Sequence, residues 1–209
     1  MRVFPLLLLC LLFSNCIEKE KSKIAVLSTQ NSPPSFERKL SDAALSILNP
    51  SIRYDPSYIS IQYPNGDVPA TTGVCTDVVI RTYRKLKIDL QKEVHEDMLS
   101  NFALYPNFEK WGMTKTDTNI DHRRVPNLEV FFERKGQKLP VSTLGNDYKT
   151  GEIVTWMIND KLPHIGIITH KKSADGQRNL IVHNVGGGQV LEDCLFDYKI
   201  VGHYKYKKE

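Results

Sequence analysis

The stretch PNGDVPATTGVCTDVVIRTYRKL, Pro64–Leu86, places one cysteine between a Gly-, Pro- and Thr-rich segment and a run with helical periodicity. Apolar residues recur every three or four positions after Cys75, which predicts a helix that begins there, with Thr71 or Thr72 as its cap. At a helix N-terminus the dipole and the unpaired N–H groups favour the thiolate. The setting therefore indicates a nucleophile with a lowered pKa.

The remaining pattern divides into helices followed by strands. Helical periodicity and apolar composition predict helices over residues 36–48, 90–102 and 127–134. β-branched and aromatic runs separated by turn residues predict strands over residues 152–158, 164–169, 179–184 and 200–206. Helices first and an antiparallel meander afterwards predict an α+β fold.

Two histidines are expected to meet at one end of this sheet. His164 opens one predicted strand, and His183 lies near the end of the next, beyond a turn at residues 173–177. Because side chains alternate along a strand, His183 and not Asn184 should share a face with His164. With Cys75 as nucleophile, this pattern predicts His164 as its base and His183 as the residue that orients the base.

The N-terminus predicts export. Arg2 precedes an apolar run over residues 3–13, which is too short for a permanent membrane span and is typical of a signal peptide. We expect residues 1–16 to be a lipoprotein-type signal with Cys16 lipidated; an ordinary cleaved signal and an uncleaved anchor are the alternatives. Residues 17–35 are predicted to be a flexible tether, and residues 36–209 the domain that carries Cys75, His164 and His183.

Composition and cysteine usage limit the remaining possibilities. The net charge is +4, from 28 basic and 24 acidic residues, and no Lys/Arg-rich block occurs, which excludes the usual pattern of a nucleic-acid-binding protein. HEDM, His95–Met98, lacks the second histidine of a zinc-peptidase helix, so we expect neither a metal nor another cofactor. After export Cys75 and Cys194 remain, and a disulfide between them is the alternative to a free nucleophile.

The strand block GEIVTWM…PHIGIIT…NLIVHN resembles that of NlpC-type cysteine peptidases. Gly151–Val154 corresponds to the first strand of that block, His164–Ile167 to the second, and Val182-His183 to the third. The resemblance implies a papain-like fold with a Cys-His-His triad. It also implies that Tyr63, twelve residues before Cys75, helps to stabilise the oxyanion.

The stretch from about Tyr54 to Tyr206 also resembles the domain-of-unknown-function family 1287, on GVCTDVVIR, HEDM, NIDHRRVPNL, DYKTGEIVTW, PHIGI and GHYKY.

The chain departs from NlpC-type enzymes, which usually have Asp-Cys-Ser-Gly around the nucleophile. It also has a long interval between Cys75 and His164, which suggests an inserted loop facing the substrate. In that loop the residues Asp121, His122, Arg123 and Arg124 are candidates for a carboxylate-binding patch. A solvated loop, or an internal ion pair between Asp121 and an arginine, is the alternative.

These observations lead to one leading hypothesis, an exported cysteine hydrolase that cleaves an amide bond. The resemblance and the compartment together imply cell-wall (peptidoglycan) peptide as the substrate. We expect a monomer in the cell envelope, held to the membrane by its N-terminal lipid and without a nucleic-acid partner. A non-catalytic cell-wall-binding module on the same scaffold, or a cysteine acyl- or peptidyl-transferase, are the alternatives.

Overall fold

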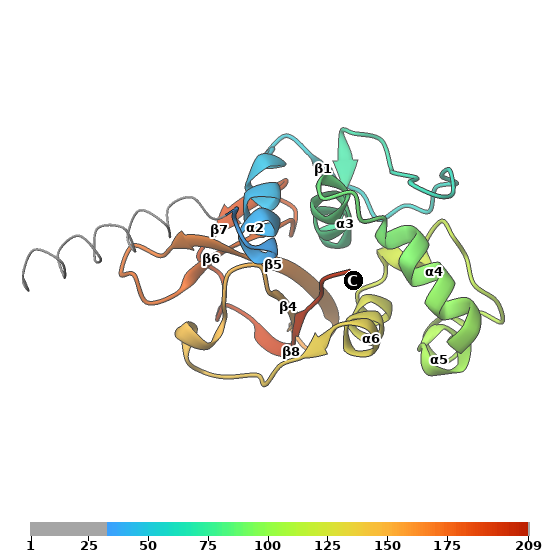
Figure 1. The fold of residues 1–209 in the computed structure, drawn as a ribbon. Helices are drawn as coiled ribbons and strands as arrows, with labels where there is room; N and C mark the ends of the chain where they lie inside the picture. The colour runs from blue at the N-terminus through green and yellow to red at the C-terminus, as the bar shows by residue number, and fades with distance from the viewer. Residues whose placement is uncertain (1–32, 209) are drawn as a thin grey trace, which may run out of the picture. The chain divides into compact units, whose positions relative to one another are not determined.

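A six-stranded antiparallel sheet, in the order β3-β8-β4-β5-β6-β7, runs through the domain (Figure 1). The computed structural model describes residues 33–208, so the expected signal peptide, the lipidated Cys16 and nearly all of the predicted tether lie outside the described residues. Residues Ser35–Glu209 form one compact unit. Within the described range, no helix has the length and apolar character needed to cross a bilayer.

The four predicted strands are all present. They are β4 (Ile153–Ile158), β5 (Leu162–Lys172), β6 (Asn179–His183) and β8 (Lys199–Lys205). β7 (Val190–Glu192) follows β6 along the sheet, and β3 (Gln137–Lys138) pairs with β8. A separate parallel pair joins β1 (Arg53–Tyr54) to β2 (Thr72–Gly73). The sequence pattern did not predict these four short strands, because two or three residues are too few to show an alternation.

Helices cover one face of the sheet. The helices are α2 (Phe36–Ser46), α3 (Cys75–Lys85), α4 (Leu90–Asn101), α5 (Asn107–Trp111) and α6 (Val125–Lys135). Three short 3-10 turns are η1 (Phe102–Leu104), η2 (Asp121–Arg123) and η3 (Gly145–Asp147). Apolar residues of α2, α3 and α6 pack with Ile165 and Ile167 of β5 in the main core. The predicted α+β class, with Cys75 as the first residue of a helix on an antiparallel sheet, is confirmed.

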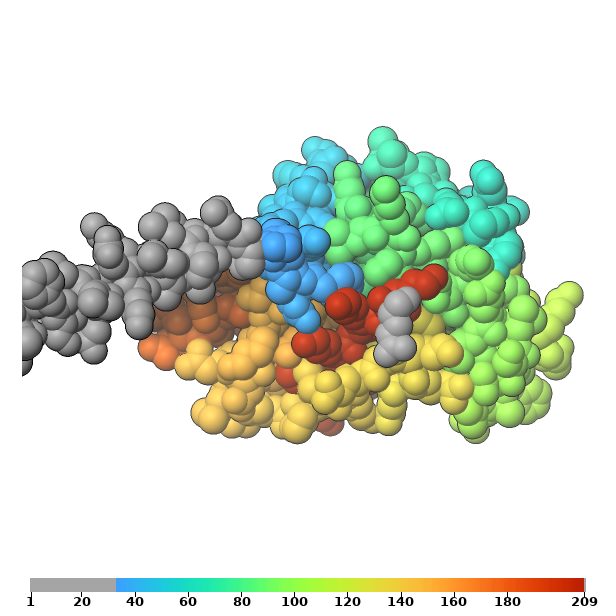
Figure 2. All heavy atoms as spheres, viewed as in Figure 1, coloured from blue at the N-terminus to red at the C-terminus, as the bar shows by residue number. Residues whose placement is uncertain are grey.

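The chain end after β8 contributes to the same core. It lies between α2 and α6, as the red spheres between the blue and yellow ones show (Figure 2). Tyr206 is buried against Phe132, with ring centroids 5.7 Å apart, and Lys205 pairs with Glu37 at 2.9 Å. The C-terminal segment therefore connects the first and last helices of the domain.

The expected cap of α3 was wrong. The N-cap is Val74, which has no polar side chain, and neither Thr71 nor Thr72 occupies that position. Instead the carboxylate of Asp77, in the first turn, accepts a hydrogen bond from the Val74 N–H at 2.7 Å. An acidic residue at the third helical position can reach back to the N-cap backbone in this way. Cys75 thus begins the helix, as predicted, but its position is fixed from within the helix.

Candidate active site

His164 and His183 meet on the sheet face that points away from the helices. Nε2 of His164 lies 2.8 Å from Nδ1 of His183, as the strand alternation predicts. The His164 ring packs on Trp156, which belongs to a second, smaller core behind the sheet. Gly166 of β5 is needed here, because a Cβ at that position would lie 2.6 Å from a methyl group of Ile181.

Glu192 extends this pair into a chain of three side chains. Its Oε2 lies 2.8 Å from Nε2 of His183. A carboxylate only accepts hydrogen bonds, so Nε2 of His183 carries the proton, and Nδ1 of His183 accepts from Nε2 of His164. Nδ1 of His164 is then left as the free lone pair, and within residues 33–208 it makes no hydrogen bond. The arrangement therefore presents a neutral imidazole in the tautomer that a general base requires. We call these three residues the histidine relay.

Burial keeps the two imidazole rings of the histidine relay uncharged. Burial and, to a smaller extent, the neighbouring His183 together lower the pKa of His164 to about 3. Burial also lowers the pKa of His183, although the Glu192 carboxylate opposes this effect. Both rings are therefore neutral at physiological pH, so Nδ1 of His164 keeps its lone pair, although a pKa this low makes the resting ring a weak base.

Cys75 lies on the other side of β5, against the strand backbone. The Ile165 N–H hydrogen-bonds the thiol, and the side chain of Ile165 packs in the helix-side core with Cys75. Cys75 and Cys194 are both free and buried, so the disulfide considered as an alternative is not formed. The thiol is thus beside the residue that follows His164, and no hydrogen bond joins it to the His164 ring in the described part of the chain. The structure therefore assembles His164 with His183 and places Cys75 next to them without direct contact.

The expectation of a low pKa for Cys75 was wrong. Burial raises the pKa of the thiol to about 11, although the Ile165 N–H, the Thr76 N–H and the Tyr54 hydroxyl each favour the thiolate. Only 4% of the residue is exposed, so the loss of hydration outweighs the helix-terminus effect. The resting nucleophile is a protonated thiol that needs a base.

The tyrosine beside the thiol is Tyr54 and not Tyr63. Tyr54, at the end of β1, interacts with the Cys75 thiol. Burial and, to a smaller extent, the nearby thiol raise the pKa of Tyr54. Tyr63 instead packs edge-on against His95 of α4, with ring centroids 5.0 Å apart. The parallel pairing of β1 with β2 brings Tyr54 opposite Gly73, two residues before the nucleophile. Counting residues along the chain could not reveal that pairing.

The predicted Asp121–Arg124 patch is mostly used internally. Arg123 gives two hydrogen bonds to Asp77, at 2.9 and 3.0 Å, and both side chains are almost fully buried. Asp121 accepts from the Asn107 amide at 2.9 Å. Burial and, to a smaller extent, the charge of Arg123 lower the pKa of His122 to about 3, so the His122 ring is neutral. Arg123 thus fixes the loop to the nucleophile helix, Asp121 binds within the loop and to Asn107, and none of the three residues is available for an anionic ligand.

Arg124 is the arginine of this loop that lines the cleft without being held in the buried pair with Asp77. Nη1 of Arg124 lies 3.4 Å from Oδ1 of Asp121, and the central carbon of its guanidinium lies 4.1 Å from the centre of the Trp111 ring. A cleft of about 330 Å³ is lined by these side chains and the thiol; its lining includes Tyr54, Cys75, Trp111, Arg123, Arg124 and Pro163. A guanidinium stacked on an indole can still present N–H donors to a carboxylate.

A larger cavity of about 900 Å³ lies elsewhere, lined by residues such as Phe108, Glu129 and Tyr204. Cys75 lines the smaller cleft and not this cavity, whereas no member of the histidine relay lines either of the two. A substrate must reach the nucleophile, so the smaller cleft is the candidate active site.

The fold and the cleft define an α+β domain with a cysteine at a helix start beside a strand-borne histidine relay. A family model described as "Domain of unknown function (DUF1287)" matches residues 41–206, and the chain belongs to this family. It is 48% identical over 167 residues to the uncharacterized protein YijF of Escherichia coli (strain K12), covering 80% of each chain.

Two solved structures are also similar in fold. NlpC1 from Trichomonas vaginalis superposes with a TM-score of 0.47 at 14% identity, over 86% of this chain and 47% of that one. NlpC2 from the same organism gives a TM-score of 0.46 at 13% identity, over 86% of this chain and 49% of that one. This chain thus spans about half the length of these two proteins.

Proposed function

We propose that this protein is an exported cysteine hydrolase that cleaves an amide bond in cell-wall peptides. The observation that carries the proposal is the position of Cys75, which opens α3, lines the cleft and touches the backbone beside His164. The histidine relay supplies a neutral base with an available lone pair. Export, the lipid on Cys16 and the cell-wall substrate remain expectations from the sequence and its NlpC-type resemblance.

His164, Cys75 and Tyr54 each have a separate role in the proposed reaction. Nδ1 of His164 takes the Cys75 proton, and the thiolate adds to the amide carbonyl. The Tyr54 hydroxyl, beside the thiol, donates to the oxyanion. The C–N bond breaks as His164 returns the proton to the leaving amine, and water then hydrolyses the thioester. The His164 ring and the Cys75 thiol rest on opposite sides of β5, so the proton transfer requires the His164 side chain to turn toward the cleft when substrate binds. Catalytic hydrogen bonds often form only in the Michaelis complex.

Digestion of purified cell wall tests the proposal directly. The wild-type protein should release peptide fragments with new amino and carboxyl ends, and Cys75→Ala should release none above background, because the covalent intermediate cannot form. Mass spectrometry of the soluble products is the measurement. A Cys75→Ala protein as active as the wild type would refute a cysteine mechanism.

The same experiment separates the two alternatives. A binding module would co-sediment with cell wall and release no fragment. A transferase would join the acyl fragment to an added amine in preference to water, and the joined product has a distinct mass.

Arg124 is expected to determine affinity for an anionic substrate. Arg124→Met should raise KM by about tenfold or more with kcat within a few-fold of wild type, because a bidentate hydrogen-bonded charge pair is lost. Arg124→Lys should recover only part of the affinity, since lysine keeps the charge and lacks the planar fork. The assay compares peptides that carry a free carboxylate with the same peptides amidated. Equal KM effects on both peptides would exclude carboxylate recognition.

A further inference from the structure

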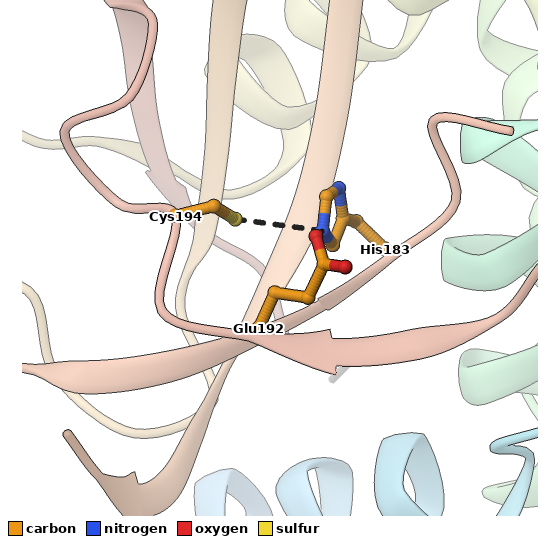
Figure 3. Close-up of side chains that lie close together, drawn as sticks. All are labelled: His183, Glu192 and Cys194. Atoms are coloured by element: carbon orange, nitrogen blue, oxygen red, sulfur yellow. Dashed lines mark hydrogen bonds and ion pairs between the residues drawn. The ribbon is translucent and has the colours of Figure 1, made fainter. Parts of the chain in front are cut away.

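Behind the sheet, Cys194 joins the histidine relay and forms a cluster with three different donor atoms. His183 comes from β6, Glu192 ends β7, and Cys194 lies in the loop that follows (Figure 3). Sγ of Cys194 lies 3.5 Å from Nε2 of His183, and the three donor atoms are all within 4.8 Å of one another. The proposed hydrolysis uses His183 and Glu192 but gives no role to Cys194.

The geometry around Nε2 of His183 is unusual for hydrogen bonding alone. Nε2 of His183 carries a single proton, which the Glu192 carboxylate at 2.8 Å already takes, so the Cys194 sulfur at 3.5 Å is at most a weak second acceptor. A cation between the three side chains would take a lone pair from each. We propose that His183, Glu192 and Cys194 bind a borderline-soft divalent cation, with Zn²⁺ as the best fit.

The donor types and spacing match zinc. Thiolate sulfur, imidazole nitrogen and carboxylate oxygen are its usual ligands, at about 2.3, 2.0 and 2.1 Å. Tetrahedral angles at those bond lengths put sulfur and nitrogen roughly 3.5 Å apart, which is the separation found between Cys194 and His183. The 2.8 Å from His183 to Glu192 is shorter than zinc requires, so the glutamate must draw back slightly.

Glu192 can make that adjustment. Its side chain is 50% exposed, whereas that of His183 is 1% exposed and Cys194 is buried. Two ligands are thus held by the strand hairpin and the core, and the third lies at the surface, where an ion can enter. Binding releases the thiol proton of Cys194 to solvent.

The site would switch off the proposed base, a consequence that rests on the proposed function. A metal at Nε2 of His183 moves the ring proton to Nδ1, which then donates to Nε2 of His164. The proton of His164 must then reside on Nδ1, the atom that would accept from Cys75. Nε2 of His183 loses one proton to solvent and Nδ1 of His164 gains one, so both rings stay neutral. Zinc is therefore expected to inhibit hydrolysis.

Cobalt binding to the full chain tests the site without any assay of activity. We expect one Co²⁺ per wild-type chain, with the intense near-ultraviolet absorption of a cobalt–thiolate bond. Cys194→Ser should abolish that band. Glu192→Gln should weaken cobalt binding by about tenfold or more, because losing even a group that only hydrogen-bonds to a metal ligand costs about ten- to hundredfold in affinity. Cys75→Ala is the matched control and should keep the band. A band lost in Cys75→Ala and kept in Cys194→Ser, or no stoichiometric binding, would overturn the proposal.

Inhibition is measured in a separate assay, in which the hydrolysis rate of each protein in zinc is compared with the rate of the same protein in chelator. We expect the wild-type rate to fall at least tenfold in zinc, and the Cys194→Ser rate to change little. Equal inhibition of both proteins would overturn the proposed switch. Cobalt bound through Cys194 in a protein that digests no cell wall would refute the proposed function and support the metal site.

Discussion

His164→Ala is expected to abolish measurable hydrolysis of cell-wall peptide. The resting thiol is protonated, with a pKa of about 11, so it attacks only if a base removes its proton. The histidine relay leaves the lone pair on Nδ1 of His164 free, and the next residue, Ile165, contacts the thiol through its N–H. General-base loss alone costs about 10²- to 10⁴-fold, and the raised thiol pKa adds to that cost. Initial rates at saturating peptide provide the measurement.

The neighbouring variants show whether the histidine relay carries the effect. His183→Ala should lower kcat by about 10²-fold, because His164 keeps its lone pair but loses its orientation and fixed tautomer. Asn184→Ala is the control one position along. Its amide donates to the Gly73 carbonyl at 3.1 Å, so its loss should lower stability by about 1–3 kcal/mol, with kcat within a few-fold of wild type. An active His164→Ala protein, or a worse kcat for Asn184→Ala than for His183→Ala, would contradict this assignment.

The sequence predicted the parts of the site that depend on local periodicity. The start of α3 at Cys75 follows from helical spacing, and the meeting of His164 with His183 follows from strand alternation across a hairpin. Alternation also implies that His164 and Ile165 point to opposite faces. Gly166 shares the face of His164, and the side chains of Ile181 and His183 fill the space over it.

The missed residues depend on pairings between distant segments. Tyr54 reaches the thiol through a two-residue parallel pair, and Glu192 reaches His183 from a three-residue strand, so neither shows a period in the sequence. The prediction of a low pKa for Cys75 was wrong for a related reason. A helix terminus is visible in the sequence, but burial depends on the whole fold, and here burial dominates.

Asp77→Asn is expected to destabilise the domain by about 3–5 kcal/mol. The pair that it breaks joins α3 to the loop carrying Arg124, and the side chains of Asp77 and Arg123 are only 3% and 2% exposed. Asparagine keeps the size of aspartate and can still accept from the Val74 N–H. It leaves the Arg123 guanidinium buried without a counter-charge, which is the costly outcome. Urea unfolding followed by circular dichroism measures the loss.

The double variant Asp77→Asn/Arg123→Met distinguishes an unpaired charge from general damage. Methionine fills much of the arginine stem and carries no charge, so the double variant should be more stable than Asp77→Asn alone. Glu133→Gln is the exposed control, since the Glu133–Lys138 pair has both side chains about half exposed and should contribute less than about 1 kcal/mol. If Asp77→Asn cost no more than Glu133→Gln, the buried pair would not be what fixes the cleft wall to the nucleophile helix.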